Sequence, residues 1–254
     1  MVHRLPVGAR VAKYVPLSAA PVVLLHPRAD QVAKDIWWGK GQPTSRADAQ
    51  VLRLIERLAP EADLFLDIGA YSALFALLAA RCNPRLRSIA YEIMPQNMIM
   101  AERNVIENDL ITRVEVRLLG LSDKPQIITM PRDYSSASNP SSISLGENFH
   151  GGVSVPVTTL DHEGHRGRIL AKIDVEGFEE AIFVGGAQTI AASRPDIICE
   201  FLSNSSAGNA VTALLKPLGY RFLISTDDGF EERPDIVPSG DGRDWLLTTR
   251  SERF

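Results

Sequence analysis

The feature that most constrains this chain is a repeated alternation of short apolar runs with segments of helical character. The runs are Leu64–Ile68, Ser88–Glu92, Val114–Leu118, Ile169–Asp174 and Asp196–Phe201. Apolar runs of this length between helices are typical of strands that are buried on both faces. Because strand–helix–strand crossovers are right-handed, the alternation predicts an α/β fold, a doubly wound parallel sheet with helices on both faces.

The helical segments carry recognisable start and stop signals. Ser45 and Asp48 form an S-x-x-D capping pattern, and apolar residues then recur at helical spacing until Pro60 ends the segment. Further helices are predicted at Gln31–Trp38, Ala73–Arg81, Pro95–Asn108, Glu179–Val184 and Ala207–Leu218. Two last strands, Tyr220–Ile224 and Trp245–Thr249, have only a loop between them, so we expect them to pair antiparallel, with one reversed strand at the end of the sheet.

The pattern indicates one main domain with a short lead-in. Residues 1–43 lack sustained periodicity and are interpreted as an N-terminal cap, and residues 44–254 as the domain itself. The serine-rich stretch Pro131–Gly152 interrupts the alternation. Long irregular insertions in compact domains are binding loops or linkers, and we favour a substrate loop over a linker here.

Composition narrows the classes of function. The 254 residues include 27 basic and 31 acidic side chains, a net charge of −4, so no basic excess indicates a nucleic-acid or membrane surface. Two cysteines without metal-ligand spacing exclude a disulfide framework. No apolar run approaches the length of a membrane span. We therefore expect a cytoplasmic protein with neither nucleic acid nor membrane as partner, and we keep a homodimer open.

Acidic residues close several of the predicted strands, where α/β sheets bind their ligands. Asp67 ends the first strand just before Gly69, and Glu92 ends the second, 23 positions after that glycine. This spacing suits a carboxylate that receives the two hydroxyls of a ribose. Asp174, with Glu176 close behind it, ends the fourth strand in the run AKIDVEG. A nicotinamide-dependent oxidoreductase also fits the acidic residue, but the chain lacks G-x-G-x-x-G.

At this point the chain resembles a known family. The segments in which the resemblance is found are FLDIGAYSALFALLAA at 65–80, AYEIMPQNMIMAERNVIEND at 90–109, LLGLSD at 118–123, VPVTTLD at 155–161 and AKIDVEGFEEAIFVGGAQTI at 171–190. They are similar to the FkbM-type family of S-adenosylmethionine-dependent methyltransferases. The resemblance implies a Rossmann-like class I methyltransferase fold, a seven-stranded, mostly parallel sheet with one reversed strand.

The resemblance also implies a cofactor site for S-adenosylmethionine, with S-adenosylhomocysteine as the product. The implied cofactor-binding residues are Asp67, Gly69, Ala70, Tyr71, Glu92, Ile93, Gly120, Leu121, Ser122 and Asp174. Glu92 holds the ribose in this assignment, and Ile93 with the 120–122 loop flanks the adenine.

One motif departs from the family pattern DIGANxGxxS. The chain reads DIGAYSALFA, which places Tyr71 at the asparagine, Ala73 at the second glycine and Ala76 at the serine. A methyl group at Ala73 is expected to crowd a close approach to the backbone, and Tyr71 is large enough to enter or cover the pocket. The alternative function is therefore a degenerate methyltransferase fold that binds a ligand or partner without catalysis.

The catalytic candidates are Asp174, Glu176, Lys172 and His150. One of the two carboxylates orders the loop or the cofactor while the other takes the proton of an acceptor hydroxyl. Lys172 lies on the face of the strand that carries Asp174, where it pairs with that carboxylate or steadies an acceptor oxygen. His150 in the serine-rich stretch is a second base. The function predicted is O-methylation of a small molecule, a sugar or a secondary metabolite.

No metal is expected. The segment Asp161–His165 contains residue types that bind metals, but it has no distant ligand to complete a site and is interpreted as a surface loop.

Overall fold

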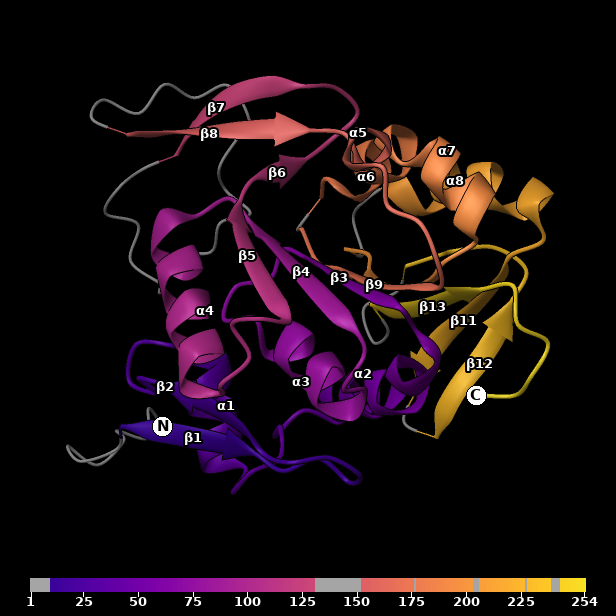
Figure 1. Ribbon diagram of the computed structural model, residues 1–254. Coiled ribbons are helices and arrows are strands. Elements are labelled where there is room, and N and C mark those ends of the chain that lie inside the picture. Colours follow the sequence, from indigo (N-terminus) through magenta and orange to yellow (C-terminus); the bar gives the residue numbers. More distant parts are fainter. Residues whose placement is uncertain (1–9, 131–151, 176, 203–205, 227, 239–242) are drawn as a thin grey trace.

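The computed structural model describes residues 10–130, 152–175, 177–202, 206–226, 228–238 and 243–254. A central sheet of eight strands runs through it in the order β12-β11-β13-β10-β9-β3-β4-β5 (Figure 1). Its strands are β3 Leu64–Ile68, β4 Arg87–Glu92, β5 Val114–Leu118, β9 Ile169–Ile173, β10 Asp196–Glu200, β11 Arg221–Thr226, β12 Gly229–Arg233 and β13 Asp244–Thr248.

Strand directions follow the prediction with two differences. The five strands β5, β4, β3, β9 and β10 are mutually parallel, and β11 pairs antiparallel with β13 as predicted. The reversed strand β13 does not end the sheet but lies between β10 and β11. An eighth strand, β12, folds back on β11 from the stretch interpreted as a loop. The α/β methyltransferase-like fold is confirmed, with one more strand than expected.

Helices cover both faces of this sheet (Figure 1). The helices are α1 Gln31–Trp38, α2 Arg46–Leu58, α3 Leu74–Cys82, α4 Pro95–Glu107, α5 Leu160–Glu163, α6 Glu179–Gly185, α7 Ala187–Ser193 and α8 Ala207–Leu215, with 3-10 turns at Ala59–Glu61 and Lys216–Leu218. Apolar side chains of α1–α4 form one core on one face, and those of α5–α8 form a second core on the other. The Ser45 side chain accepts the Asp48 N–H, which confirms the predicted start of α2.

A small second sheet stands beside the ends of β4 and β5 (Figure 1). It contains β6 Gly120–Leu121, β7 Gln126–Met130 and β8 Val153–Thr158 in the order β6-β8-β7. Buried side chains of β7 and β8 pack with Met94 at the start of α4. The sequence had indicated only irregular structure here, and residues 131–151, which make up nearly all of the predicted substrate loop, lie outside the described residues.

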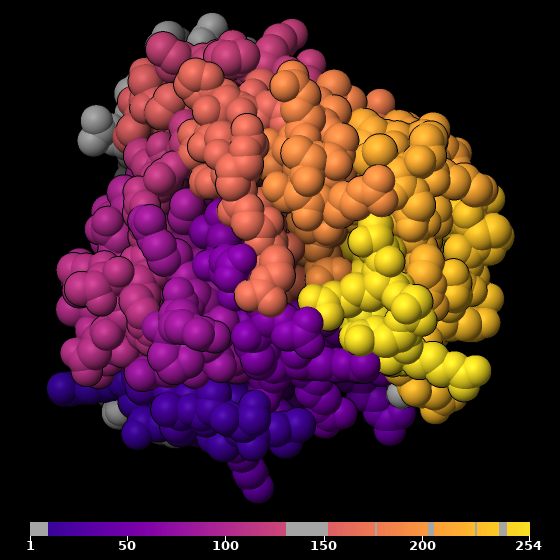
Figure 2. Space-filling view, turned by 45° about the vertical axis from the view of Figure 1, so that its right-hand side comes forward, coloured from indigo at the N-terminus to yellow at the C-terminus, as the bar shows by residue number. Residues whose placement is uncertain are grey.

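The described part of the N-terminal segment is more ordered than the sequence indicated. Strands β1 Val11–Tyr14 and β2 Val22–Leu25 form an antiparallel pair before the predicted helix α1, which is confirmed. Tyr14 donates to Glu56 of α2, while Asn104 of α4 and Asn108, which caps the end of that helix, accept N–H groups of β2. In Figure 2 this indigo segment lies along the lower side of the molecule, against the main body.

The junction between α6 and β6 is packed at backbone level and carries one side of the pocket described below. A Cβ added at Gly185 meets the Ser122 carbonyl oxygen at 2.0 Å. We expect Gly185→Ala to lower the free energy of unfolding by about 2–3 kcal/mol, because neither backbone yields without disturbing its neighbours. Urea unfolding measures the change. Val184→Ala, at a 51% exposed position in the same helix, is the control, and an equal effect of both would contradict the prediction.

Candidate active site

A pocket of about 390 Å³ opens at the carboxyl ends of the parallel strands. The turn after β3 forms one wall, the turn after β4 a second, and the β5–β6 connection a third. Nine of the residues proposed from the sequence line it, namely Gly69, Ala70, Tyr71, Glu92, Ile93, Gly120, Leu121, Ser122 and Asp174. Ligands of open α/β sheets bind at this edge, so these residues form a candidate ligand site.

The turn after β3 depends on Gly69. Its φ is +84°, and an added Cβ would lie 1.9 Å from the Asp174 carbonyl oxygen, so β3 and β9 end in direct backbone contact. The N–H groups of Gly69 and Ala70 both donate to the Tyr91 carbonyl at 3.0 Å. These two N–H groups hold the turn to β4, and the glycine is needed for the close packing of three strand ends.

Glu92 joins two walls of the pocket. Its carboxylate accepts the Tyr71 N–H at 2.8 Å and the Met94 N–H at 2.7 Å, one on each oxygen. The side chain is buried, which raises the pKa of its carboxyl, and the backbone hydrogen bonds oppose that rise. This carboxylate is therefore fixed in orientation at the pocket wall, where its remaining acceptor capacity can receive a pair of vicinal hydroxyls.

Asp67 does not line the pocket but lies beneath it. Its Oδ2 accepts the Ala76 N–H at 2.9 Å in the first turn of α3, where the N-cap residue Ala73 offers no side chain for the purpose. Its Oδ1 is buried without a hydrogen-bond partner among the described residues. Burial raises the pKa of Asp67 to about 7. Asp67 thus holds the start of α3, whereas the resemblance had counted it among the cofactor-binding residues.

Lys172 is buried next to the pocket among carboxylates. Its Nζ lies 3.4 Å from Asp174 Oδ2 and 3.8 Å from Asp244 Oδ1, and 5.7 Å from the centre of the Phe75 ring. Burial alone would lower the pKa of Lys172, but the carboxylates of Asp174 and Asp244 outweigh it and raise that pKa. The ammonium therefore stays charged, so it pairs with Asp174 as the sequence indicated.

Comparison with known proteins identifies the family. A family model described as the methyltransferase FkbM domain matches residues 67–222, more than half of the chain. The chain belongs to the FkbM methyltransferase family. No curated protein matches it.

Three solved structures resemble this family member at low identity. The methyltransferase FkbM of Methylobacillus flagellatus KT is 15% identical with a TM-score of 0.48, over 73% of this chain and 44% of that one. The chain thus spans less than half the length of that structure. A precorrin-6y C5,15-methyltransferase of Geobacter metallireducens GS-15 is 15% identical (TM-score 0.44; 79% and 86% covered), and the M1A22 tRNA methyltransferase TrmK of B. subtilis is 15% identical (0.41; 77% and 63%).

The departures from the family's glycine motif have a backbone explanation. Tyr71 has a φ of +47° and Ala73 a φ of +61°, in the left-handed region that asparagine and glycine adopt most easily. The turn therefore keeps the conformation typical of the family's residue types. Ala73 is fully buried and does not line the pocket, contrary to the expected crowding. Tyr71 does line it, and its hydroxyl accepts the Gln31 N–H at 3.2 Å, which ties α1 to the rim.

Two catalytic candidates, His150 and Glu176, lie outside the described residues. The sequence missed Glu200, which ends β10 beside Asp174 and forms an ion pair with Arg243 at 3.2 Å. Burial and the nearby Asp174 raise the pKa of Glu200 to about 7. The one sequence feature that could have pointed to Glu200 was its position near the end of the predicted strand Asp196–Phe201.

The segment Asp161–His165 is not the surface loop that was expected. Its first three residues belong to α5, and the Tyr91 hydroxyl contacts Glu163 at 2.8 Å and His165 Nε2 at 2.7 Å, with both partners largely buried. A tyrosine of β4 thus draws this segment onto the sheet.

Within the described ranges, no group of three or more His, Cys, Asp or Glu side chains is arranged to hold a metal ion. None of the helices described is long and apolar enough to span a membrane.

The pKa of Asp67 generates a prediction on stability. An ordinary aspartate has a pKa near 3.9 when unfolded, so a folded-state pKa of about 7 favours folding at low pH, and this contribution is lost as the pH rises through 7. Between pH 5 and 8 the stability of the wild type relative to Asp67→Asn should fall by on the order of 2–4 kcal/mol. Urea unfolding at both pH values measures it, with the exposed Glu107→Gln as control. A difference that is independent of pH would contradict the prediction.

Proposed function

We propose that this protein is an S-adenosylmethionine-dependent O-methyltransferase that acts on a hydroxyl of a small molecule and releases S-adenosylhomocysteine. The observation that carries the proposal is the Glu92 carboxylate, buried in the pocket wall and fixed by two backbone N–H groups. Membership of the FkbM methyltransferase family supports the reaction type.

The pocket residues fit the proposed cofactor. Glu92 suits the two ribose hydroxyls, because a carboxylate accepts two hydrogen bonds from one side. Beside it, Ile93 and Leu121 present apolar side chains, and Ile128 with Met130 closes the pocket from the small sheet. An apolar slot of this kind suits the flat face of an adenine. We assign the methionine end to the turn at Gly69–Tyr71.

The proposed chemistry requires one proton acceptor. Bound S-adenosylmethionine supplies an electrophilic methyl group on a sulfonium, so the protein's main tasks are to align the acceptor and exclude water. Asp174 lines the pocket, and we propose that it takes the hydroxyl proton as the new O–CH₃ bond forms. The ion pair with Lys172 holds the Asp174 carboxylate in place. Glu200 lies beside Asp174 at the end of β10 and interacts electrostatically with both Asp174 and Lys172.

The acceptor we propose is a small molecule, a sugar or a secondary metabolite, and not a nucleic acid. Asp174, Glu200 and Asp244 place three carboxylates around one buried ammonium next to the pocket. A phosphate backbone would meet an excess of like charge there. The rim at α1 and Tyr71 further narrows the approach, which favours a compact acceptor.

Cofactor binding tests the proposal first. We expect Glu92→Gln to weaken the binding of S-adenosylmethionine and S-adenosylhomocysteine about 10- to 100-fold, since a hydrogen bond to a charged group contributes roughly 1.5–3 kcal/mol. Isothermal titration calorimetry measures both ligands, and the thermal unfolding midpoint checks that the variant is folded. Glu102→Gln, at an exposed position of helix α4 away from this pocket, is the matched control.

The alternative function makes the opposite prediction for the wild type. If Tyr71 closes the pocket and the fold serves only to bind another ligand or a partner, neither compound gives heat or a thermal shift at millimolar concentration. Unchanged affinity in Glu92→Gln would instead remove Glu92 from the ribose site.

The proton acceptor is tested separately from binding. Asp174→Asn should lower kcat by about 10²-fold or more and leave the affinity for S-adenosylmethionine within about threefold, because the amide cannot take a proton. Release of S-adenosylhomocysteine is measured with a panel of monosaccharides and phenols as acceptors. Glu102→Gln again serves as control. A variant that keeps full kcat would exclude Asp174 as the base.

A further inference from the structure

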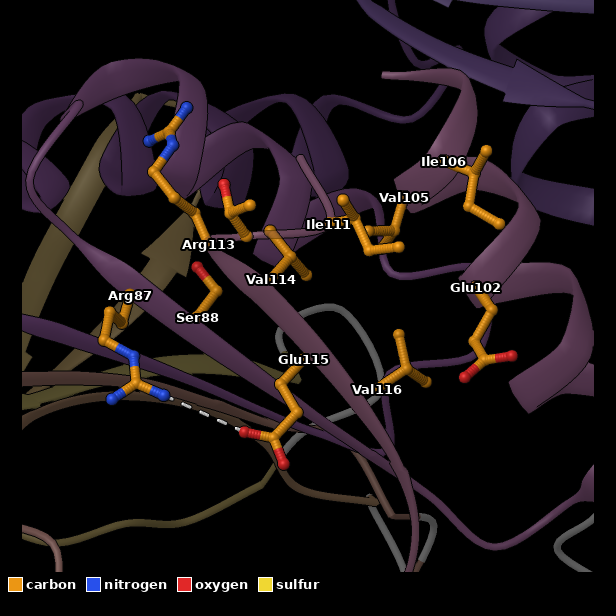
Figure 3. Close-up of a pocket in the computed structure, with 11 residues that line it drawn as sticks. Arg87, Ser88, Glu102, Val105, Ile106, Ile111, Arg113, Val114, Glu115 and Val116 are labelled. Carbon is orange, nitrogen blue, oxygen red and sulfur yellow. Dashed lines mark ion pairs between the residues drawn. The ribbon is translucent and has the colours of Figure 1, made fainter. Parts of the chain in front are cut away.

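The free edge of the central sheet carries a surface that the proposed reaction does not use. Strand β5 ends the sheet, and no described strand pairs with its outer side. A groove of about 390 Å³ runs beside it, lined by β5, by Glu102 and Ile106 of α4 and by Ile111 (Figure 3). Ile106 is 61% exposed and Ile111 70%, which is unusual for isoleucine. A sheet edge flanked by apolar side chains is a typical site for pairing with another strand.

The backbone of β5 shows which residues face outward. The Arg113 carbonyl accepts the Ser88 N–H, and the Leu119 N–H donates to the Glu92 carbonyl, so odd-numbered residues of β5 pair with β4. Because alternate residues of a strand direct their N–H and C=O to opposite sides, Val116 and Leu118 direct theirs to the outer edge. The Val114 N–H is taken by the Leu110 carbonyl, which limits any new pairing to residues 114–118.

The side chains of β5 have complementary charges when two β5 strands, one from each of two copies of the chain, pair antiparallel. In an antiparallel pair of two β5 strands centred on Val116, Glu115 lies opposite Arg117 of the second copy, and Arg117 opposite Glu115 of the second copy. These two pairs occupy sites without cross-strand hydrogen bonds, where opposing side chains are closest. In the single chain Glu115 and Arg117 already form an ion pair at 2.7 Å, so both charges lie on the same face.

The other edge of the sheet is less suited to such a pairing. Strand β12 carries Glu231, Glu232 and Arg233, and although pairing centred on Glu232 sets Glu231 opposite Arg233, it also sets the two Glu232 carboxylates against each other. Like charges directly opposite destabilise a pair of strands. The exposed isoleucines Ile99 and Ile106 also lie one above the other on α4, beside β5, whereas Glu231 and Arg233 at the β12 edge are exposed charges.

We propose that two copies of this chain form a symmetric dimer in which their β5 strands pair antiparallel about Val116, joining the two sheets into one. The twofold axis passes through the Val116 pair, so the same patch serves both copies. The α4 helices then lie on the same face on either side of the axis, and Ile106 and Ile111 are covered.

Sedimentation velocity of the full chain between about 1 and 100 µM tests the proposal. The wild type should show a concentration-dependent species of twice 27.9 kDa. Val116→Pro removes the central donor without touching the β4 pairing, and Glu115→Arg creates two like-charge contacts, so each should raise the dissociation constant about tenfold or more. Glu231→Arg on β12 is the matched control and should leave it unchanged.

A mixing experiment distinguishes this register from others. Glu115→Arg and Arg117→Glu should each dimerise about tenfold or more weakly than the wild type when alone, while an equimolar mixture should form a heterodimer with about the affinity of the wild type, because each Arg then faces a Glu. Thermal unfolding shows that each variant is folded, and if Arg117→Glu does not fold, Val116→Pro and Glu115→Arg decide. A wild type that stays monomeric, whether because β5 takes a strand of another protein or none, would overturn the proposal. So would a dimer that survives Val116→Pro and Glu115→Arg.

Discussion

The close approach of Gly69 to the Asp174 carbonyl is the constraint on which the rest of the site depends. Only a residue without a side chain lets β3 and β9 end so close together. The turn that follows is then held by the Tyr91 carbonyl on one side and by the Glu92 carboxylate on the other. Three parallel strands thus share one rigid edge, and the pocket is the space that this edge leaves open.

Burial determines the electrostatic properties of the ionisable side chains at this edge of the sheet. Asp67 and Glu92 are buried and Glu200 is partly buried, and burial raises the pKa of each. Lys172 is the buried cation among them and remains charged because Asp174 and Asp244 surround it. Burying these ionisable groups costs solvation free energy at the carboxyl ends of the strands. Ionisable groups with shifted pKa values are found most often at functional sites.

Local sequence patterns predicted much of this structure. The Ser45 cap, the apolar run before Gly69 and the antiparallel pairing of the strands later described as β11 and β13 depend on neighbouring residues, so the sequence revealed them. The strands β6–β8 and β12 are short or partly exposed, and periodicity does not distinguish such strands from loops. Asp244 and Glu200 reach Lys172 from distant parts of the chain, and Tyr91 draws Glu163 and His165 inward, which no spacing rule could indicate. Tyr71 and Ala73 showed a departure in residue type, whereas the backbone they adopt became visible only in three dimensions.

The position of β13 also has a consequence for the order in which the fold is completed. This strand lies between β10 and β11 yet follows both in the chain, and its reversed direction brings Asp244 to the edge that holds Lys172. During synthesis β10 and β11 therefore emerge before the strand that joins them. Until β13 has emerged, β10 lacks its neighbour and the ammonium of Lys172 lacks one of its counter-charges. Completion of the sheet and completion of the charges around Lys172 thus depend on the same strand.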